Sequence, residues 1–272
     1  MSGPADTRLP VEPAARSALR AVAIPSEHGG WGLTLEPALL GMLVSPSLAG
    51  VALALAAFVA FVARTPLKVV LVDHWRHHVR DRTKIASRVL AIELVLLAGL
   101  VAVAIAVAHA TFLWPFAFAA PLVVVELWFD MRSRSRRLIP ELAGAVGIAA
   151  VAAMIILADG ADTRLAVGLW LLLGARGITA IPYVRAQIAR LHHRARRART
   201  LAVADATSVV VAGSAVVLDA ELGLGALAVA AVIVAQRVWA RRPVPTAKVL
   251  GLRQMGLGLA VVAVTAVGVH IL

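Results

Sequence analysis

Long apolar runs alternate with short basic clusters along the chain from about residue 25 onward. A helix needs roughly 20 residues to cross about 30 Å of hydrocarbon, and most of the runs approach that length. We predict membrane spans at 30–47, 48–63, 89–108, 111–129, 140–158, 165–184, 206–219, 222–236 and 254–272. The pattern therefore predicts an all-α protein, a polytopic bundle of about nine transmembrane helices. Tilt or local thinning of the bilayer would accommodate the shorter spans.

The basic clusters fall at one end of these predicted spans. Of the 27 Lys and Arg residues, all except Arg164 and Arg176 lie before the first span or after the second, fourth, sixth or eighth span. Cytoplasmic loops hold Lys and Arg, because these side chains resist translocation. The distribution therefore predicts a cytoplasmic N-terminus and an external C-terminus.

The composition and the charge agree with a membrane protein. The chain is 61% hydrophobic with a mean hydropathy of +0.88, far from an average soluble domain. The net charge of +12 follows from the basic loops, which also attract anionic head groups of the inner leaflet, so we expect membrane lipids as partners. We expect no nucleic-acid partner, because the sequence carries no nucleic-acid recognition motif. The chain has no cysteine, so it has no disulfide and no thiolate ligand.

The same pattern divides the chain into two parts. Residues 1–24 are rich in Ala and Pro and are predicted to form a disordered cytoplasmic tail. Residues 25–272 are predicted to form a single transmembrane helical domain. Its long cytoplasmic loops are expected at 64–88 and 185–205, where the basic residues are densest.

Charged residues inside the apolar runs are the first candidates for a site. Arg176 lies near the middle of its predicted span, where a charge costs roughly 2.5–3.5 kcal/mol on insertion scales. Such a charge persists when it faces a polar cavity or has a partner, and we expect that partner to be Glu36 or Glu141. Two interpretations stay open: these residues bind a ligand, or a buried ion pair fixes the register of the helices.

The segment before the first span contains a second group of candidates, Glu27-His28-Gly29-Gly30-Trp31. Glu27 and His28 supply a carboxylate and an imidazole, a candidate acid/base pair. The glycines leave backbone amides accessible, as at an anion site on a helix N-terminus, whereas Trp31 is also typical of a simple interfacial anchor.

This segment resembles the His-Gly-(Ala/Gly)-Trp box of the YwiC-like family of bacterial membrane proteins. The resemblance implies a multi-pass protein of the bacterial cytoplasmic membrane. It implies no substrate and no mechanism.

The predicted plan also resembles the UbiA-type aromatic prenyltransferases, which have nine helices, a cytoplasmic N-terminus and two long cytoplasmic loops. Local similarity extends to Pro140, Glu141 and Gly144, where a basic turn precedes a helix start. The resemblance implies a prenyl diphosphate bound through Mg²⁺, which aspartates of the two loops would hold. In that chemistry the metal also stabilises the leaving diphosphate.

The chain departs from that family at the aspartates. The first acidic motif falls on Val72, Asp73, Arg76 and Arg80, so that arginine replaces two acids. The second falls on the loop after Tyr183, where no acid appears before Asp205. Arginines would repel Mg²⁺ and bind an anion directly. We therefore expect an anionic or isoprenoid lipid-like ligand without Mg²⁺, with candidate contacts at Asp73, Arg76, Arg80, Tyr183 and Arg185.

The first long loop allows a rival interpretation. If it is helical, then His74, His77, His78 and Asp81 share one face at i, i+3, i+4 and i+7. Imidazoles with a carboxylate can hold a borderline metal such as Zn²⁺. The neighbouring arginines oppose a dication, and a basic helix on the head groups explains the same pattern. Our expectation is no metal site, with His74, His78 and Asp81 as the weak candidates and the cofactor unknown.

Two classes of function therefore stay open. In the first, the protein is a lipid-modifying enzyme or a degenerate one, whose cavity opens toward the cytoplasm. In the second, it is non-catalytic, either a small-solute transporter or an assembly factor for a respiratory complex. Charged residues at mid-membrane favour a transporter, whereas the basic loops favour an anion-binding pocket.

Overall fold

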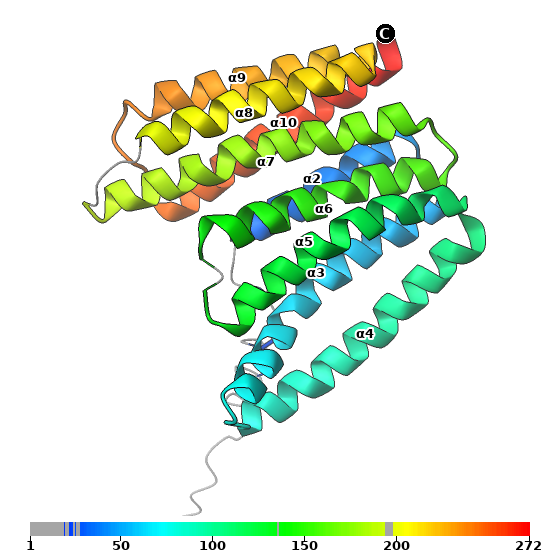
Figure 1. Cartoon of the computed structure of the whole chain (residues 1–272), viewed down its shortest axis with the longest axis vertical. Coiled ribbons are helices and arrows are strands. Elements are labelled where there is room, and N and C mark those ends of the chain that lie inside the picture. Colours follow the sequence, from blue (N-terminus) through cyan, green and yellow to red (C-terminus); the bar gives the residue numbers. More distant parts are fainter. Residues whose placement is uncertain (1–18, 20–21, 24, 26–27, 135, 194–197) are drawn as a thin grey trace, which may run out of the picture.

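The computed structural model describes residues 19, 22–23, 25, 28–134, 136–193 and 198–272. Within these ranges the chain is helical, without strands (Figure 1). The long helices are α2 (His28–Val44), α3 (Leu48–Trp75), α4 (Asp81–Val107), α5 (Leu113–Met131), α6 (Leu138–Ala158), α7 (Thr163–Leu191), α8 (Ala198–Leu218), α9 (Gly223–Trp239) and α10 (Ala247–Ile271). Short 3₁₀ turns, Ala110–Phe112 and Ala220–Leu222, precede α5 and α9.

Eight of the described helices, α3 to α10, are long and apolar enough to cross a membrane by length and composition. A shorter apolar helix, Gly30–Val44, lies within α2. The prediction of an all-α, multi-pass membrane protein is therefore confirmed. The predicted tail, 1–24, lies mostly outside the described residues.

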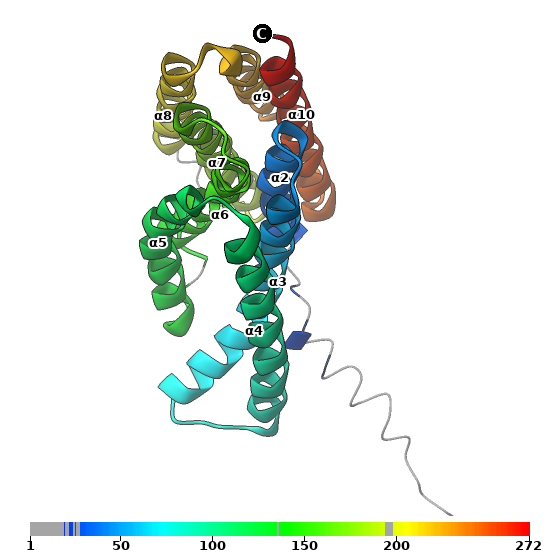
Figure 2. The same cartoon turned by 90° about the vertical axis from the view of Figure 1, so that its right-hand side faces the viewer.

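Helices α6 and α7 form the centre of the bundle, and α4 lies at its edge (Figures 1 and 2). Ile155 and Ile156 on α6, and Leu169 and Leu172 on α7, are fully buried. Of the most apolar part of each helix, 61% is buried in α6 and 67% in α7, but only 11% in α4. The helices are rich in Ala and Gly, and such small residues let helix backbones approach closely where lipid surrounds them.

The polar turns between the helices lie at two ends of the bundle. At one end the Ser45 hydroxyl donates to Asp159 over 2.5 Å, and His270 Nε2 lies 2.9 Å from the Leu43 carbonyl oxygen. We call the other end, with the turns after α3, α5, α7 and α9, the basic end, because it carries the described basic clusters. That the basic end faces the cytoplasm stays a prediction of the charge distribution.

The predicted long loops are largely helical, which corrects the expected boundaries. Helix α3 continues to Trp75 and α4 begins at Asp81, so that most of 64–88 is helix. Likewise α7 continues to Leu191 and α8 begins at Ala198, within the predicted loop 185–205. A helix of 28 residues is about 42 Å long at 1.5 Å per residue, longer than the hydrocarbon core. Charged residues can thus follow the apolar run on the same helix.

Candidate functional site

A buried ion-pair cluster joins α3 to α5 near the basic end. Asp130 is fully buried and accepts from Arg64 Nε at 2.9 Å and Nη2 at 3.3 Å. Lys68 Nζ lies 3.3 Å from the same carboxylate, and Arg64 also pairs with Glu126 at 3.0 Å. Arg64 and Lys68 are one helical turn apart, as are Glu126 and Asp130, so rows of opposite charge face each other.

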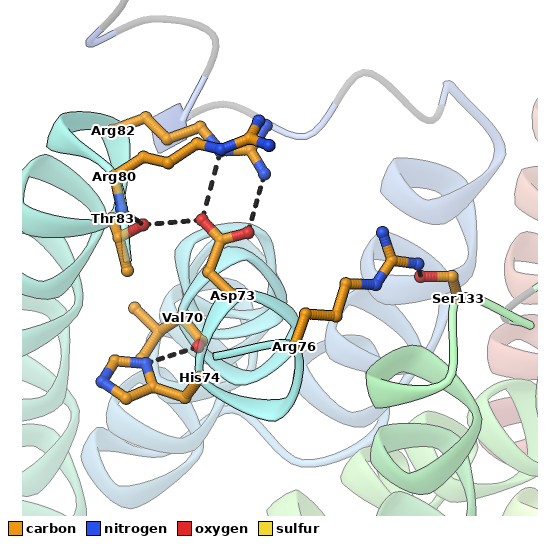
Figure 3. Close-up of polar contacts among 8 residues, drawn as sticks. All are labelled: Val70, Asp73, His74, Arg76, Arg80, Arg82, Thr83 and Ser133. Atoms are coloured by element: carbon orange, nitrogen blue, oxygen red, sulfur yellow. Dashed lines mark hydrogen bonds and ion pairs between the residues drawn. The ribbon is translucent and has the colours of Figure 1, made fainter. Parts of the chain in front are cut away.

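A cleft of about 370 Å³ opens beside this cluster; we call it the basic cleft, and it is lined by Lys68, Ser133, Arg134, Arg136 and Arg137. Ser133 has a left-handed backbone, with φ of 54°, which turns the chain sharply after α5. Arg76 at the end of α3 donates to the Ser133 hydroxyl oxygen over 2.9 Å (Figure 3). The end of α3 is thus tied to the wall of the cleft.

Two more of the predicted ligand residues lie at the same turn. Arg185 on α7 donates to Glu141 Oε2 and to the carbonyl oxygen of Arg136, both over 2.8 Å. Since Arg136 lines the basic cleft, the structure brings Arg76, Arg185 and Glu141 to its border.

Asp73 lies in a different environment from the residues at the border of the basic cleft. Its carboxylate, 3% exposed as a residue, accepts from Arg82 Nη2 at 2.7 Å and Nε at 3.2 Å, and from the Thr83 hydroxyl at 2.6 Å (Figure 3). The Thr83 hydroxyl oxygen in turn accepts from the backbone N–H of Arg80 at 3.0 Å. Asp73 therefore anchors the turn between α3 and α4, and its two oxygens already have donors.

The helical face proposed for a metal site is not formed. Helix α3 ends at Trp75 and His77 has a left-handed backbone, with φ of 53°, so His74, His78 and Asp81 lie on separate segments. His74 Nδ1 lies 2.8 Å from the Val70 carbonyl oxygen (Figure 3), and Asp81 is exposed beside Lys84. Among the described residues, no group of three His, Asp or Glu side chains is placed to hold a metal ion.

Tyr183 lies apart from the basic cleft. It is buried in a small apolar cluster with Leu201, Ala240 and Leu250, contributed by α8, the turn after α9, and α10. The structure therefore separates it from Arg76 and Arg185, with which we expected it to share a pocket.

Arg176 lies at the centre of the bundle, with Glu36 of α2 as its partner. Its Nη2 lies 3.1 Å from Glu36 Oε1 and donates to the Gln254 carbonyl oxygen over 2.5 Å. Arg176 and Glu36 are 2% and 3% exposed. Of the two partners predicted from the sequence, Glu36 is therefore the correct one, while Glu141 pairs with Arg185.

Polar side chains continue from this pair toward the basic end. Gln236 Nε2 donates to Gln254 Oε1 over 3.2 Å, and the Thr179 hydroxyl lies 3.2 Å from Gln236 Oε1. The same hydroxyl donates to Asp205 over 2.6 Å, and Asp205 pairs with Arg237. These side chains link α7, α8, α9 and α10 through the apolar interior.

The box at the start of α2 packs against α3. Glu27 and the side chain of His28 lie outside the part that the structure describes. Trp31 and Phe61 meet edge to face, with ring centroids 5.1 Å apart. A Cβ on Gly30 would lie 2.5 Å from the Phe61 ring, so the close approach requires glycine there. Phe61 is one turn from Arg64, and the box therefore borders the ion-pair cluster.

Sequence reasoning missed part of both sites: Arg64, Lys68, Asp130, Arg134, Arg136, Arg137, Gln236 and Gln254. The signal for the ion-pair cluster was present, because Arg64 and Lys68 repeat at i+4 and so do Glu126 and Asp130. No comparable signal marked the two glutamines, since nothing in one sequence shows which helices face each other.

Alanine substitutions at Gly144 and Gly147 on α6 would test how tightly the ion-pair cluster is packed. A Cβ on Gly144 would lie 2.6 Å from Glu126 Oε1, whereas one on Gly147 would lie 3.5 Å from Leu122 Cβ. We expect Gly144→Ala to lower the free energy of unfolding by about 1–3 kcal/mol, because it pushes Glu126 away from Arg64. Gly147→Ala should change it by no more than about 1 kcal/mol. Thermal unfolding in detergent measures both, and equal stability of the two variants would contradict this packing.

Comparison with known proteins finds a similarity for part of the chain. No curated protein and no solved structure matches it, so the resemblance to UbiA-type enzymes stays an expectation from the sequence. Residues 24–157 match a family model described as YwiC-like protein. That segment contains Glu36, the ion-pair cluster and every residue that lines the basic cleft. The chain is therefore similar to the YwiC-like family over residues 24–157, just under half of its length, and has the architecture of a multi-pass membrane protein.

Proposed function

We propose that the protein binds the phosphate or diphosphate head group of an anionic, isoprenoid-type lipid in the basic cleft, at the cytoplasmic end of the bundle. The observation that carries this proposal is the lining of the basic cleft, where Lys68, Arg134, Arg136 and Arg137 converge. Guanidinium groups present several N–H donors in a planar fork, which suits phosphate oxygens. The nearby Arg76 and Arg185 add positive charge at the border.

A lipid suits this position better than a soluble anion. The basic cleft lies where α3, α5 and α6 leave the apolar layer, and α5 exposes apolar side chains below it. Arg132 stacks over the Trp128 ring, with 4.0 Å between the guanidinium carbon and the ring centroid. Tryptophan is typical of the membrane interface, so a head group in the basic cleft would lie at interface depth, with its tail along α5.

Binding through arginine needs no bridging metal. The neighbouring carboxylates Asp73, Asp130 and Glu141 are each paired with a cation at 2.7–3.3 Å. Their negative charge is thereby balanced within the protein. The proposal therefore covers direct head-group binding and assigns no group-transfer reaction to these residues.

The test is lipid binding by the detergent-purified full chain. A ligand at about 100 times its dissociation constant should add roughly 2.7 kcal/mol to the stability of the folded state. We expect farnesyl diphosphate and phosphatidylglycerol to raise the melting temperature, with or without Mg²⁺, and phosphatidylcholine to have no effect. A preference for farnesyl diphosphate would identify an isoprenoid ligand, and equal effects would identify a general anionic lipid.

Arg134→Gln with Arg137→Gln should weaken this binding at least tenfold. One hydrogen bond to a charged group contributes about 1.5–3 kcal/mol, and a factor of ten corresponds to about 1.4 kcal/mol. The matched control is Arg241→Gln with Arg242→Gln, which removes the same charge in the turn after α9. Helix α9 packs on α7, α8 and α10, away from the basic cleft. Equal loss in both pairs would reduce the effect to net charge and refute the proposed site.

A further inference from the structure

Of the arginine–carboxylate contacts in the described part of the chain, that of Arg176 with Glu36 has both side chains 3% exposed, whereas in the others the arginine is at least 26% exposed. Arg64 and Arg82 each reach a carboxylate through both Nε and Nη2, a bidentate arrangement. Arg176 instead meets Glu36 through Nη2 alone, and the 3.1 Å contact lacks hydrogen-bond geometry. A guanidinium gains most from a carboxylate when it forms two parallel hydrogen bonds. The central pair is therefore almost fully buried but lacks the bidentate geometry that Arg64 and Arg82 have.

Three polar atoms at this place have no hydrogen-bond partner among the described residues. They are Glu36 Oε1, Arg176 Nε and Gln254 Nε2. Arg176 and Glu36 are more than nine-tenths buried, and Gln254 is 7% exposed. An unsatisfied buried polar group is costly, and Arg176 Nη2 connects the three residues through its contacts with Glu36 Oε1 and the Gln254 carbonyl oxygen. Their two donors and one acceptor without partners therefore indicate a site that a polar ligand completes.

The Glu36 carboxylate lies against backbone rather than against side chains on one side. A Cβ on Gly258 of α10 would overlap Glu36 Oε1, and one on Gly32 would lie 3.8 Å from the same oxygen. The other close neighbour of Gly32 is the side chain of Met255, which is flexible. Glycine at position 258 thus lets the backbone of α10 approach the Glu36 carboxylate closely, and the flexible Met255 side chain is the group beside it that can move.

We propose that Arg176 forms a second binding site, independent of the basic cleft, which takes a small monocarboxylate in exchange for the Glu36 carboxylate. Arg176 already faces a carboxylate, that of Glu36. A solute carboxylate of similar size can therefore form the same kind of ion pair with Arg176. Arg176 Nε and Gln254 Nε2 supply the donors for its oxygens.

Charge balance in the buried site determines which ion enters together with the solute anion. When the solute carboxylate pairs with Arg176, Glu36 takes up one proton from the surrounding water and becomes neutral. The site then holds one cation and one anion, as it does before binding, so no net charge is buried. One proton enters with each anion, and both leave together when Glu36 again faces Arg176.

Arg176 is the charged group that contacts Glu36 among the described residues. The helices packed on α2 are α3, α6, α7 and α10. Their other titratable side chains lie toward the ends: Arg64, Lys68, Asp73 and His74 on α3, Glu141 on α6, Arg164, Tyr183, Arg185 and Arg190 on α7, and Lys248, Arg253 and His270 on α10. The proton balance of the central site therefore depends on Glu36 and Arg176. Hydrogen bonds from Gln254 through Gln236 and Thr179 connect the surroundings of the pair with Asp205 toward the basic end.

The test is calorimetric titration of the detergent-purified full chain with sodium lactate, in buffers of different ionisation enthalpy. We expect about one proton to be taken up per lactate bound. The dissociation constant should rise about tenfold for each pH unit above the titration of Glu36, because proton and anion binding are linked. A purely structural ion pair would produce neither effect.

Two variants separate the roles of the pair. Glu36→Gln mimics the protonated carboxyl, so it should bind lactate without proton uptake and without pH dependence. Arg176→Lys keeps the charge but loses the fork, and should weaken binding at least tenfold, whereas Arg199→Lys on the exposed face of α8 should leave it unchanged. If Arg176→Lys does not fold, the wild-type proton uptake and Glu36→Gln decide the question.

Four results would overturn the proposal. The first three are no binding of lactate to the folded wild type at any pH, binding without proton uptake, and equal binding to a folded Arg176→Lys variant. The fourth is loss of lactate binding in Arg134→Gln with Arg137→Gln, which would place the anion in the basic cleft instead. Normal lactate binding in that variant supports the central site, whatever the outcome for lipids.

Discussion

Glu36→Leu should lower the free energy of unfolding by about 3–5 kcal/mol, because it leaves the Arg176 guanidinium buried without a counter-charge. Arg176 is 2% exposed near the middle of α7 and cannot reach water by extending its side chain. Arg176→Met should have a smaller effect, since an unpaired Glu36 carboxylate can take up a proton and become neutral, whereas arginine stays charged. Unfolding of the purified protein in a graded detergent series measures both.

The double variant Glu36→Leu with Arg176→Met distinguishes the value of the pair from the cost of breaking it. Replacing a buried ion pair by apolar side chains is often neutral or stabilising, so we expect the double variant to recover most of the lost stability. It should nevertheless lose lactate binding. If the double variant is destabilised by the sum of the two single effects, the two side chains do not act as a pair and the central site is wrongly described.

The helical plan was predictable because apolar runs of membrane length leave the backbone few choices. Where no water satisfies the peptide groups, a run of about 20 apolar residues has few alternatives to a helix. The boundaries at the basic end were predicted poorly for a related reason. Arginine and lysine mark the end of the apolar layer rather than the end of the helix, so α3 continues to Trp75 through charged positions such as Lys68.

The candidate sites, like the helices, could be predicted from the sequence only in part. A mid-membrane arginine requires a counter-charge, and this requirement alone reduced the partners of Arg176 to two, one of which was correct. Asp73 was predicted to contact a ligand from a motif, but its oxygens are occupied by Arg82 and Thr83. Such pairings depend on the angle at which α3 meets α4, and no pattern in one sequence encodes that angle.

Arginine thus has two different roles in this fold. At the basic end, Arg64 and Arg82 form bidentate pairs that hold α3 to α5 and to α4, while other cations line the basic cleft. At the centre, Arg176 forms an incomplete pair, with donors that have no partner among the described residues. Arg176 therefore differs from Arg64 and Arg82 both in its burial and in its incomplete hydrogen bonding.

Asp130→Asn should be the most destabilising change at the basic end. Asp130 is fully buried and balances Arg64 and Lys68, so its neutralisation removes the carboxylate that these two cations share. We expect a loss of about 3–5 kcal/mol in the free energy of unfolding. The matched control is Asp81→Asn, which removes the same charge from an exposed contact with Lys84 and should cause no measurable change.

The same variant also tests how the ion-pair cluster relates to the basic cleft. Lys68 belongs to both, so removing the Asp130 charge raises the positive potential of the basic cleft while it weakens the fold. The folded Asp130→Asn variant, measured below its melting temperature, should therefore bind farnesyl diphosphate at least as tightly as the wild type. Lower stability together with weaker lipid binding would mean that Asp130 shapes the basic cleft itself, because a change in charge alone predicts opposite signs for the two effects.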